Sequence, residues 1–136
     1  MKIVILLQIL FISLININFV TSCRCMRPLF QDIEKDFLKT DAIFTGYATK
    51  VVKGTGTRIY EFNVLKKWKG KSIKFGKTVD ISTGTDCFGS TFNLYTQYII
   101  WAGYSNGKLT THLCTRNGLY MDNKVVMKEL DRITRK

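Results

Sequence analysis

Four cysteines carry the clearest chemistry in this sequence. They are Cys23, Cys25, Cys87 and Cys114, and a single residue separates the first two. Four thiolates can bind zinc tetrahedrally, whereas an even number of cysteines in an exported domain usually forms disulfides. Neither Cys87 nor Cys114 has a close ligand partner in the sequence. Disulfides are therefore the favoured interpretation, with a zinc site as the alternative.

The spacing of the cysteines makes one of their possible disulfide pairings unfavourable. Four cysteines allow three pairings. A bridge from Cys23 to Cys25 would close a strained ring around one intervening residue. We therefore expect both to pair forward, one with Cys87 and the other with Cys114, and the spacing leaves open which goes to which.

Residues 1–22 have the three parts of a secretory signal peptide. Lys2 is the only charge before Arg24, an apolar run covers residues 3–20, and small side chains precede Cys23. A membrane anchor is the alternative, but a span needs about 20 predominantly apolar residues. Four polar residues interrupt this run: Gln8, Ser13, Asn16 and Asn18. We predict cleavage after Ser22 and one exported domain at 23–136, secreted, or periplasmic or surface-attached if the source is bacterial.

The chain is strongly basic and lacks recognisable catalytic motifs. It has 21 Lys and Arg against 10 Asp and Glu, a formal net charge of +11. His112 is its only histidine, and no Ser-His-Asp set, HExxH, P-loop or paired-carboxylate motif is present. We therefore expect neither an enzyme nor a cofactor of its own.

One stretch of the chain is especially rich in lysine. It contains Lys66, Lys67, Lys69, Lys71, Lys74 and Lys77. Such a run is either a solvated face or a surface for anionic glycans or a cell envelope. Export argues against nucleic acid as the partner.

The elements that position the cysteines are mostly strands. Alternating apolar side chains, such as Tyr60, Phe62 and Val64, predict five strands. These are Asp41–Val52, Thr57–Trp68, Thr78–Thr83, Gln97–Gly103 and Leu109–Cys114. Asn106-Gly107 predicts a hairpin turn, and Gly84–Ser90 is a loop that carries Cys87.

Helical periodicity is present on both sides of the strands. An N-terminal apolar face after Pro28 consists of Phe30, Ile33, Phe37 and Leu38. A C-terminal face has Val126, Leu130 and Ile133, with Asp122 or Asn123 as its cap. The predicted fold class is mostly β: a five-stranded OB-type barrel with flanking N- and C-terminal helices.

Several segments together resemble a known family. They are Cys23-Arg24-Cys25 directly after the signal peptide, residues 37–46, Trp68-Lys69-Gly70, Thr85-Asp86-Cys87-Phe88-Gly89, and residues 98–103 and 107–114. The pattern resembles the N-terminal, netrin-like domain of the tissue inhibitors of metalloproteinases, especially compact one-domain members of that superfamily. The resemblance covers most of residues 23–120.

The resemblance implies a fold, a bridge pattern and a mechanism. It implies an OB-type, netrin-like barrel with bridges Cys23–Cys87 and Cys25–Cys114, and we expect a monomer. It implies that the α-amine and carbonyl of Cys23 chelate the catalytic zinc of a metalloproteinase, so that the only metal is shared with that partner. The protease contacts it implies are Cys23, Arg24, Cys25, Met26, Thr85 and Asp86.

Two departures from the family pattern keep other interpretations open. Arg24 stands where the family usually has a small polar residue that enters the protease S1′ pocket, which is commonly apolar. Burying an unpaired guanidinium there is costly. Asp86 is likewise an unusual acid in its loop. Either the target pocket is acidic or open, or the domain is a netrin-like module that binds anionic glycans or envelope components. A lipoprotein acylated at Cys23 is a third interpretation, since residues 20–23 also resemble a lipobox.

Overall fold

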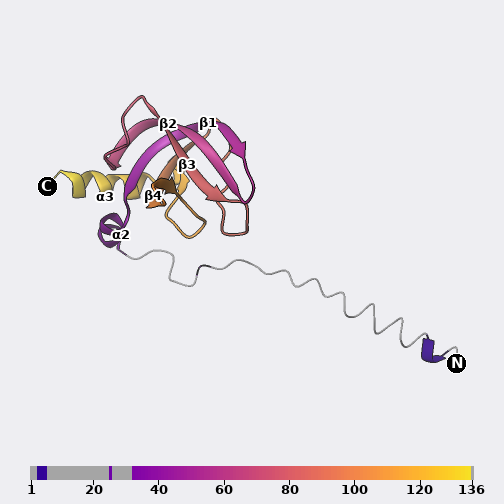
Figure 1. Ribbon diagram of the computed structural model, residues 1–136. Coiled ribbons are helices and arrows are strands. Elements are labelled where there is room, and N and C mark those ends of the chain that lie inside the picture. The colour runs from indigo at the N-terminus through magenta and orange to yellow at the C-terminus, as the bar shows by residue number, and fades with distance from the viewer. Residues whose placement is uncertain (1–2, 6–24, 26–31, 136) are drawn as a thin grey trace.

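The computed structural model describes residues 3–5, 25 and 32–135 (Figure 1). Most of the predicted signal peptide, its cleavage site, and Cys23, Arg24 and Met26 lie outside the described residues. Within them no helix is both long and apolar enough to cross a membrane.

The described chain is mostly β, with one six-stranded sheet and flanking helices. The strands are β1 (Ala42–Lys53), β2 (Thr57–Lys69), β3 (Thr78–Gly84), β4 (Gln97–Ser105), β5 (Lys108–Thr110) and β6 (Gly118–Leu119). Their order is β1-β2-β3-β5-β4-β6, and β1 also pairs with β4. The sheet therefore curls into a partial ring. Its parallel β3–β5 seam has a single register pair, Ser82 with Thr110.

Strand β1 bends so that it can pair on both sides. Its pairing with β2 shifts register at three places along the strand, and its first half also pairs with β4. Such irregularities increase the local bend and twist of a strand. At Gly46 a Cβ would lie 2.2 Å from the Asn63 carbonyl oxygen, so only glycine permits this close approach of β1 and β2.

The inside of the ring holds an apolar core. Alternate residues of β2, Tyr60, Phe62 and Val64, are buried there, which confirms the predicted inward face. Phe92 links this face to the opposite strand, with ring centroids 5.3 Å from Phe62 and 5.1 Å from Tyr98 in edge-on geometry. Edge-to-face packing suits the quadrupoles of aromatic rings. Val79 and Ile81 of β3 also contribute, as predicted.

A second core lies outside the ring, under helices α2 (Ile33–Lys39) and α3 (Lys124–Thr134), which Figure 1 shows on one side of the sheet. We call it the helix-covered core, and its buried members are Ile43, Trp68, Ile99, Trp101, Met127 and Leu130. It explains why β4 is apolar on both faces: Ile100 points into the ring core while Ile99 and Trp101 point under the helices.

The N-terminal helix differs in part from the prediction. Ile33 and Phe37 pack against the helix-covered core, but Leu38 is 73% exposed, so its predicted place in the apolar face is wrong. The helix ends at Lys39, one residue after Leu38. Near this end, the Phe37 carbonyl oxygen accepts a hydrogen bond from the Lys69 ammonium. Phe30 and Pro28 lie outside the described residues.

The fifth predicted strand is also corrected. The Asn106-Gly107 turn forms, with positive φ at both residues, but the returning strand β5 ends at Thr110 rather than Cys114. Residues 111–117 turn away, and the two-residue strand β6 then rejoins β4. The sheet thus has six strands in a partial ring, where the sequence predicted a five-stranded barrel.

Candidate functional site

Two loops meet at one edge of the ring, and together they form what we call the disulfide edge: residues 84–90 and 111–117. The Leu113 amide donates to the Phe88 carbonyl oxygen at 2.7 Å, which joins the loops directly. The Thr111 amide donates to the Ser82 carbonyl at 2.9 Å, which anchors the second loop to β3. Segments far apart in the sequence therefore form one continuous backbone surface.

The loop at 84–90 is a tight turn organised by Asp86. The Asp86 carboxylate accepts a hydrogen bond from the Phe88 amide at 3.1 Å, and its carbonyl accepts one from the Gly89 amide at 3.0 Å. A side chain that closes a turn on its own backbone is typical of Asp in loops. A Cβ on Gly89 would lie 1.8 Å from the Gly84 carbonyl oxygen, so this position requires glycine.

The same loop is tied to the ring by an arginine. The Arg58 guanidinium donates to the Gly84 carbonyl at 3.2 Å and to the Thr91 hydroxyl at 3.1 Å. The Ser90 amide donates to the Thr83 hydroxyl at 2.7 Å in a buried contact. Both ends of the loop are therefore fixed, while Thr85 and Asp86 between them are exposed.

In the loop at 111–117, side chains make the hydrogen bonds to β4 that a neighbouring strand would otherwise make. Between β5 and β6 the backbone of Trp101 has no strand partner on that side. The Asn117 side-chain oxygen accepts from the Trp101 amide at 2.7 Å, and the Thr111 hydroxyl donates to the Trp101 carbonyl at 2.9 Å. These bonds satisfy buried backbone groups that otherwise carry an energetic penalty. They are the physical reason that the predicted strand ends early.

The disulfide edge takes its name from the cysteines that it carries. Cys25 is bridged to Cys114 with a Cα–Cα separation of 5.6 Å, the pairing that the family resemblance implies. Cys87 is disulfide-bonded as well. A four-thiolate zinc site is therefore excluded. The predicted Cys23–Cys87 bridge itself lies outside the described residues.

The predicted contact residues fall into two groups. Cys25, Thr85 and Asp86 all belong to the disulfide edge or are bridged to it, whereas Cys23, Arg24 and Met26 lie outside the described residues.

The structure adds two exposed apolar residues at the same edge. Phe88 is 44% exposed and Leu113 is 49% exposed, and their backbones share the hydrogen bond that joins the loops. Neither residue is among the contacts predicted from the sequence. The available signal was an apolar side chain next to a cysteine in each loop.

His112 has a local role at this edge. Its Nδ1 accepts from the Cys114 amide at 3.1 Å, so the ring helps to close the turn that carries the bridge. In the part of the chain that the structure describes, no three His, Cys, Asp or Glu side chains form a group that could hold a metal ion.

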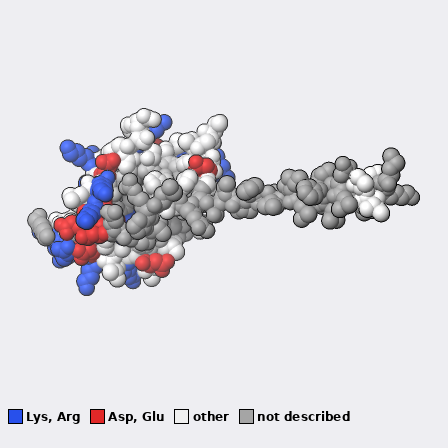
Figure 2. Space-filling view, turned by 90° about the horizontal axis from the view of Figure 1, so that it is seen from below, with Lys and Arg blue, Asp and Glu red and all other residues white. Residues whose placement is uncertain are grey.

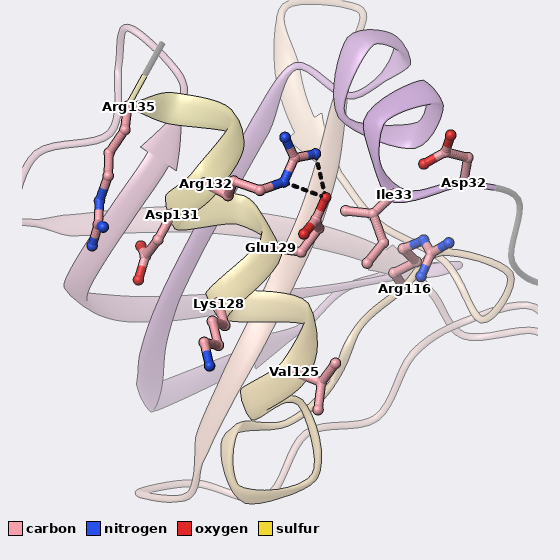
Figure 3. A pocket seen from close by; sticks show the side chains of 9 residues that line it. All are labelled: Asp32, Ile33, Arg116, Val125, Lys128, Glu129, Asp131, Arg132 and Arg135. Atoms are coloured by element: carbon pink, nitrogen blue, oxygen red, sulfur yellow. Dashed lines mark hydrogen bonds and ion pairs between the residues drawn. The ribbon is translucent and has the colours of Figure 1, made fainter.

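A separate hollow of about 940 Å³ lies between α2 and α3 (Figure 3). Side chains of both charges line it, and Figure 3 shows Arg132 bonded to Glu129 within α3. Arg116, another lining residue, is paired with Asp36 at 2.5 Å. Arg132 and Arg116 thus have carboxylate partners, and the charged side chains that line the hollow are four basic and three acidic, so it offers little net charge for an ionic ligand.

The lysines of the lysine-rich stretch fall into two groups, those whose side chains have hydrogen-bond partners and those whose side chains have none among the described residues. The Lys66 ammonium and the Trp68 indole N–H both bond the Asp131 carboxylate at 2.8 Å, and these hydrogen bonds hold the pKa of Asp131 below its ordinary value. Lys69 donates to the Phe37 carbonyl at 2.7 Å. Figure 2 shows basic and acidic side chains mixed at the left of the face that it draws.

The other four lysines of the stretch are exposed, and their side-chain ammonium groups have neither a hydrogen bond nor an ion pair to the described residues: Lys67, Lys71, Lys74 and Lys77. The run predicted from sequence is thus part structural and part free surface.

No protein-family model matches this chain, and no curated protein matches it.

Proposed function

We propose that the chain is an exported inhibitor of zinc metalloendopeptidases that acts through the α-amine and carbonyl of Cys23. In this proposal the partial ring is an OB-type, netrin-like barrel, cleavage after Ser22 creates the new N-terminus, and Cys23 pairs with Cys87. The disulfide edge is the surface that meets the protease.

The observation that carries the proposal is the convergence of the disulfide-bonded loops. Cys25 is bridged to the 111–117 loop, and that loop is hydrogen-bonded through Leu113 and Phe88 to the loop with the disulfide-bonded Cys87. A chain that begins at Cys23 would start two residues before one of these attachment points. Its first residues would then be next to Thr85 and Asp86, the exposed residues that the family resemblance marks as protease contacts.

The chemistry of such an N-terminus fits a catalytic zinc ion. Catalytic zinc keeps one position open for water or substrate. An α-amine has a reference pKa of about 8, so part of it is neutral near pH 7, and the metal displaces the remaining proton. An amine and a carbonyl oxygen on one residue form a five-membered chelate. Two bridges near this residue would order it before binding, which lowers the entropic cost of association.

In the structure Asp86 helps to shape its own loop, a role that its position in the sequence does not suggest. Its carboxylate is bonded to the Phe88 amide, so it shapes the loop as well as facing solvent. Its acidity therefore does not by itself argue against protease contact.

Arg24 selects the target in this proposal. A guanidinium in the S1′ pocket requires an acidic or open pocket, because an apolar one would bury an unpaired charge.

The test is an inhibition constant measured for mature protein that begins at Cys23 against a panel of zinc endopeptidases with acidic, open and apolar S1′ pockets. We expect the mature protein to inhibit endopeptidases with acidic or open S1′ pockets. Arg24→Thr should lower the inhibition constant for those with apolar pockets by on the order of tenfold or more. A serine protease without zinc is the control. If neither protein inhibits any member of the panel, the proposal is wrong.

A further inference from the structure

The loop between β2 and β3 presents an aromatic ring to solvent. Phe75 is 76% exposed, the highest value of any aromatic residue in the described chain. A phenylalanine that exposed contributes little to folding, because its apolar surface stays in water. Phe75 occupies a corner of the turn 74–77, in which the Lys77 amide donates to the Lys74 carbonyl at 3.1 Å and Gly76 has a φ of +71°.

This loop is firmly attached to the ring. Ile73, two residues before Phe75, is fully buried in the ring core. The Gly76 amide donates to the Val64 carbonyl at 2.9 Å, and the Ser72 and Tyr104 hydroxyls lie 2.6 Å apart. The aromatic ring is therefore held out by an ordered turn, which lowers the entropic cost of inserting it into a partner.

Positive charge surrounds the exposed ring. Lys71, Lys74 and Lys77 belong to the same loop, are exposed, and have no ion pair within the described residues. No Asp or Glu occurs between Glu61 and Asp80. Lys108 lies nearby, lining a hollow that it shares with Ser72, Tyr104 and Asp80. The loop thus combines an apolar tip with a basic rim.

We propose that this loop docks the protein on an anionic phospholipid bilayer, with Phe75 entering the boundary between headgroups and acyl chains and the lysines contacting the anionic headgroups. The basic rim alone would equally suit a sulfated glycan. The exposed ring decides for a bilayer, because a bilayer offers an apolar layer that receives Phe75 and a polysaccharide does not. The proposal is independent of protease inhibition, since the disulfide edge is formed by other loops.

The test is co-sedimentation with vesicles of 30% phosphatidylglycerol in phosphatidylcholine and with pure phosphatidylcholine vesicles. We expect binding to the first only. Phe75→Ala should weaken partitioning about tenfold. Replacing Lys71, Lys74 and Lys77 by Gln should weaken it on the order of a hundredfold, from about 1 kcal/mol for each basic residue at an anionic surface.

A charge-matched control separates this loop from overall charge. Lys50, Lys53 and Lys124 are exposed and lie on other elements, so their triple Gln variant should keep vesicle binding. Equal losses in the two triple variants would show that net charge alone drives binding and would overturn the proposal. So would wild-type binding to heparin without binding to vesicles, or full binding by Phe75→Ala.

A fluorescence measurement checks insertion of the ring directly. Trp68 and Trp101 are only 8% and 2% exposed, so a Phe75→Trp variant adds a single solvent-facing indole. Its emission should shift to the blue when phosphatidylglycerol vesicles are added. An unshifted spectrum with protein bound to the vesicles would contradict insertion.

Discussion

The helix-covered core and the disulfide edge flank the same strand, β4, but different forces hold them. In the helix-covered core, Ile99 and Trp101 are buried under α3, with Leu130 fully buried opposite. At the disulfide edge, turns, side-chain hydrogen bonds and bridges fix the backbone while Phe88 and Leu113 remain exposed. A surface that must meet a partner has to be ordered without burying its contact groups, and the disulfide edge satisfies that requirement.

The largest expected effect is in the helix-covered core. Leu130→Ala should lower the free energy of unfolding by about 3–4 kcal/mol, because it leaves a cavity at a fully buried position. Val125→Ala is the matched control on the same helix, since Val125 is 82% exposed and should change stability by less than about 0.5 kcal/mol. Denaturant unfolding measures both. Equal effects would mean that α3 does not pack as described.

At the disulfide edge the corresponding test is Gly89→Ala. The added Cβ would lie 1.8 Å from a backbone oxygen, so the turn must shift, at a cost of about 1–3 kcal/mol. Gly103→Ala is the control, because its Cβ would meet only the Asp41 carboxylate at an ordinary 3.5 Å. Thermal unfolding compares the two variants. A neutral Gly89→Ala would show that the turn is looser than the structure indicates.

A smaller effect is expected where a charge supports the helix-covered core. Because hydrogen bonds from Lys66 and Trp68 lower the pKa of Asp131, its contribution is present above the ordinary Asp pKa and is lost as pH falls through the lowered value. Asp131→Asn should cost about 1 kcal/mol at pH 7, allowing for its partial exposure. The difference from wild type should shrink below about pH 4.

The control for this pH dependence is Asp122→Asn. Asp122 is exposed and makes no hydrogen bond or ion pair with the described residues. Its variant should differ from the wild type by less than about 0.5 kcal/mol in the free energy of unfolding at pH 7. A stability gap for Asp131→Asn that persists at pH 2–3 would mean that geometry, not ionisation, makes the contribution.

The smallest expected effect separates two properties of Asp86, its side-chain oxygen as a hydrogen-bond acceptor and its negative charge. Asp86→Ala removes the acceptor for the Phe88 amide and should cost about 0.5–1 kcal/mol. Asp86→Asn keeps a side-chain oxygen that can close the same turn, so it should be close to neutral. If the two variants lose the same stability, the negative charge rather than the turn is what matters.

Elements defined by local periodicity could be predicted from the sequence. The alternation of Tyr60, Phe62 and Val64, the Asn106-Gly107 turn and the spacing of Val126 and Leu130 each depend on neighbours in the chain, and the structure has all three. The first four predicted strands end within two residues of the observed bounds. Burial on two faces of β4 was visible only as a continuous apolar run.

What could not be predicted depends on contacts between distant residues. The strand after Leu109 ends early because Asn117 and Thr111 bond the backbone of Trp101, and no local pattern encodes that contact. Strand β6 has two residues, too few for any periodicity. Lys66 belongs to a lysine run in the sequence but finds its partner, Asp131, on the C-terminal helix.

The most direct test of the account is to add one alanine before Cys23 and to measure inhibition of a zinc endopeptidase that the mature protein inhibits. The extension moves the α-amine away from Cys23 while leaving all four cysteines in place. Chemical acetylation is a poorer test because it would also modify the many lysines. The account predicts that the extended protein unfolds like the native one but loses inhibition by at least a hundredfold, since one zinc ligand is gone. Equal inhibition by both forms would contradict chelation by the N-terminus.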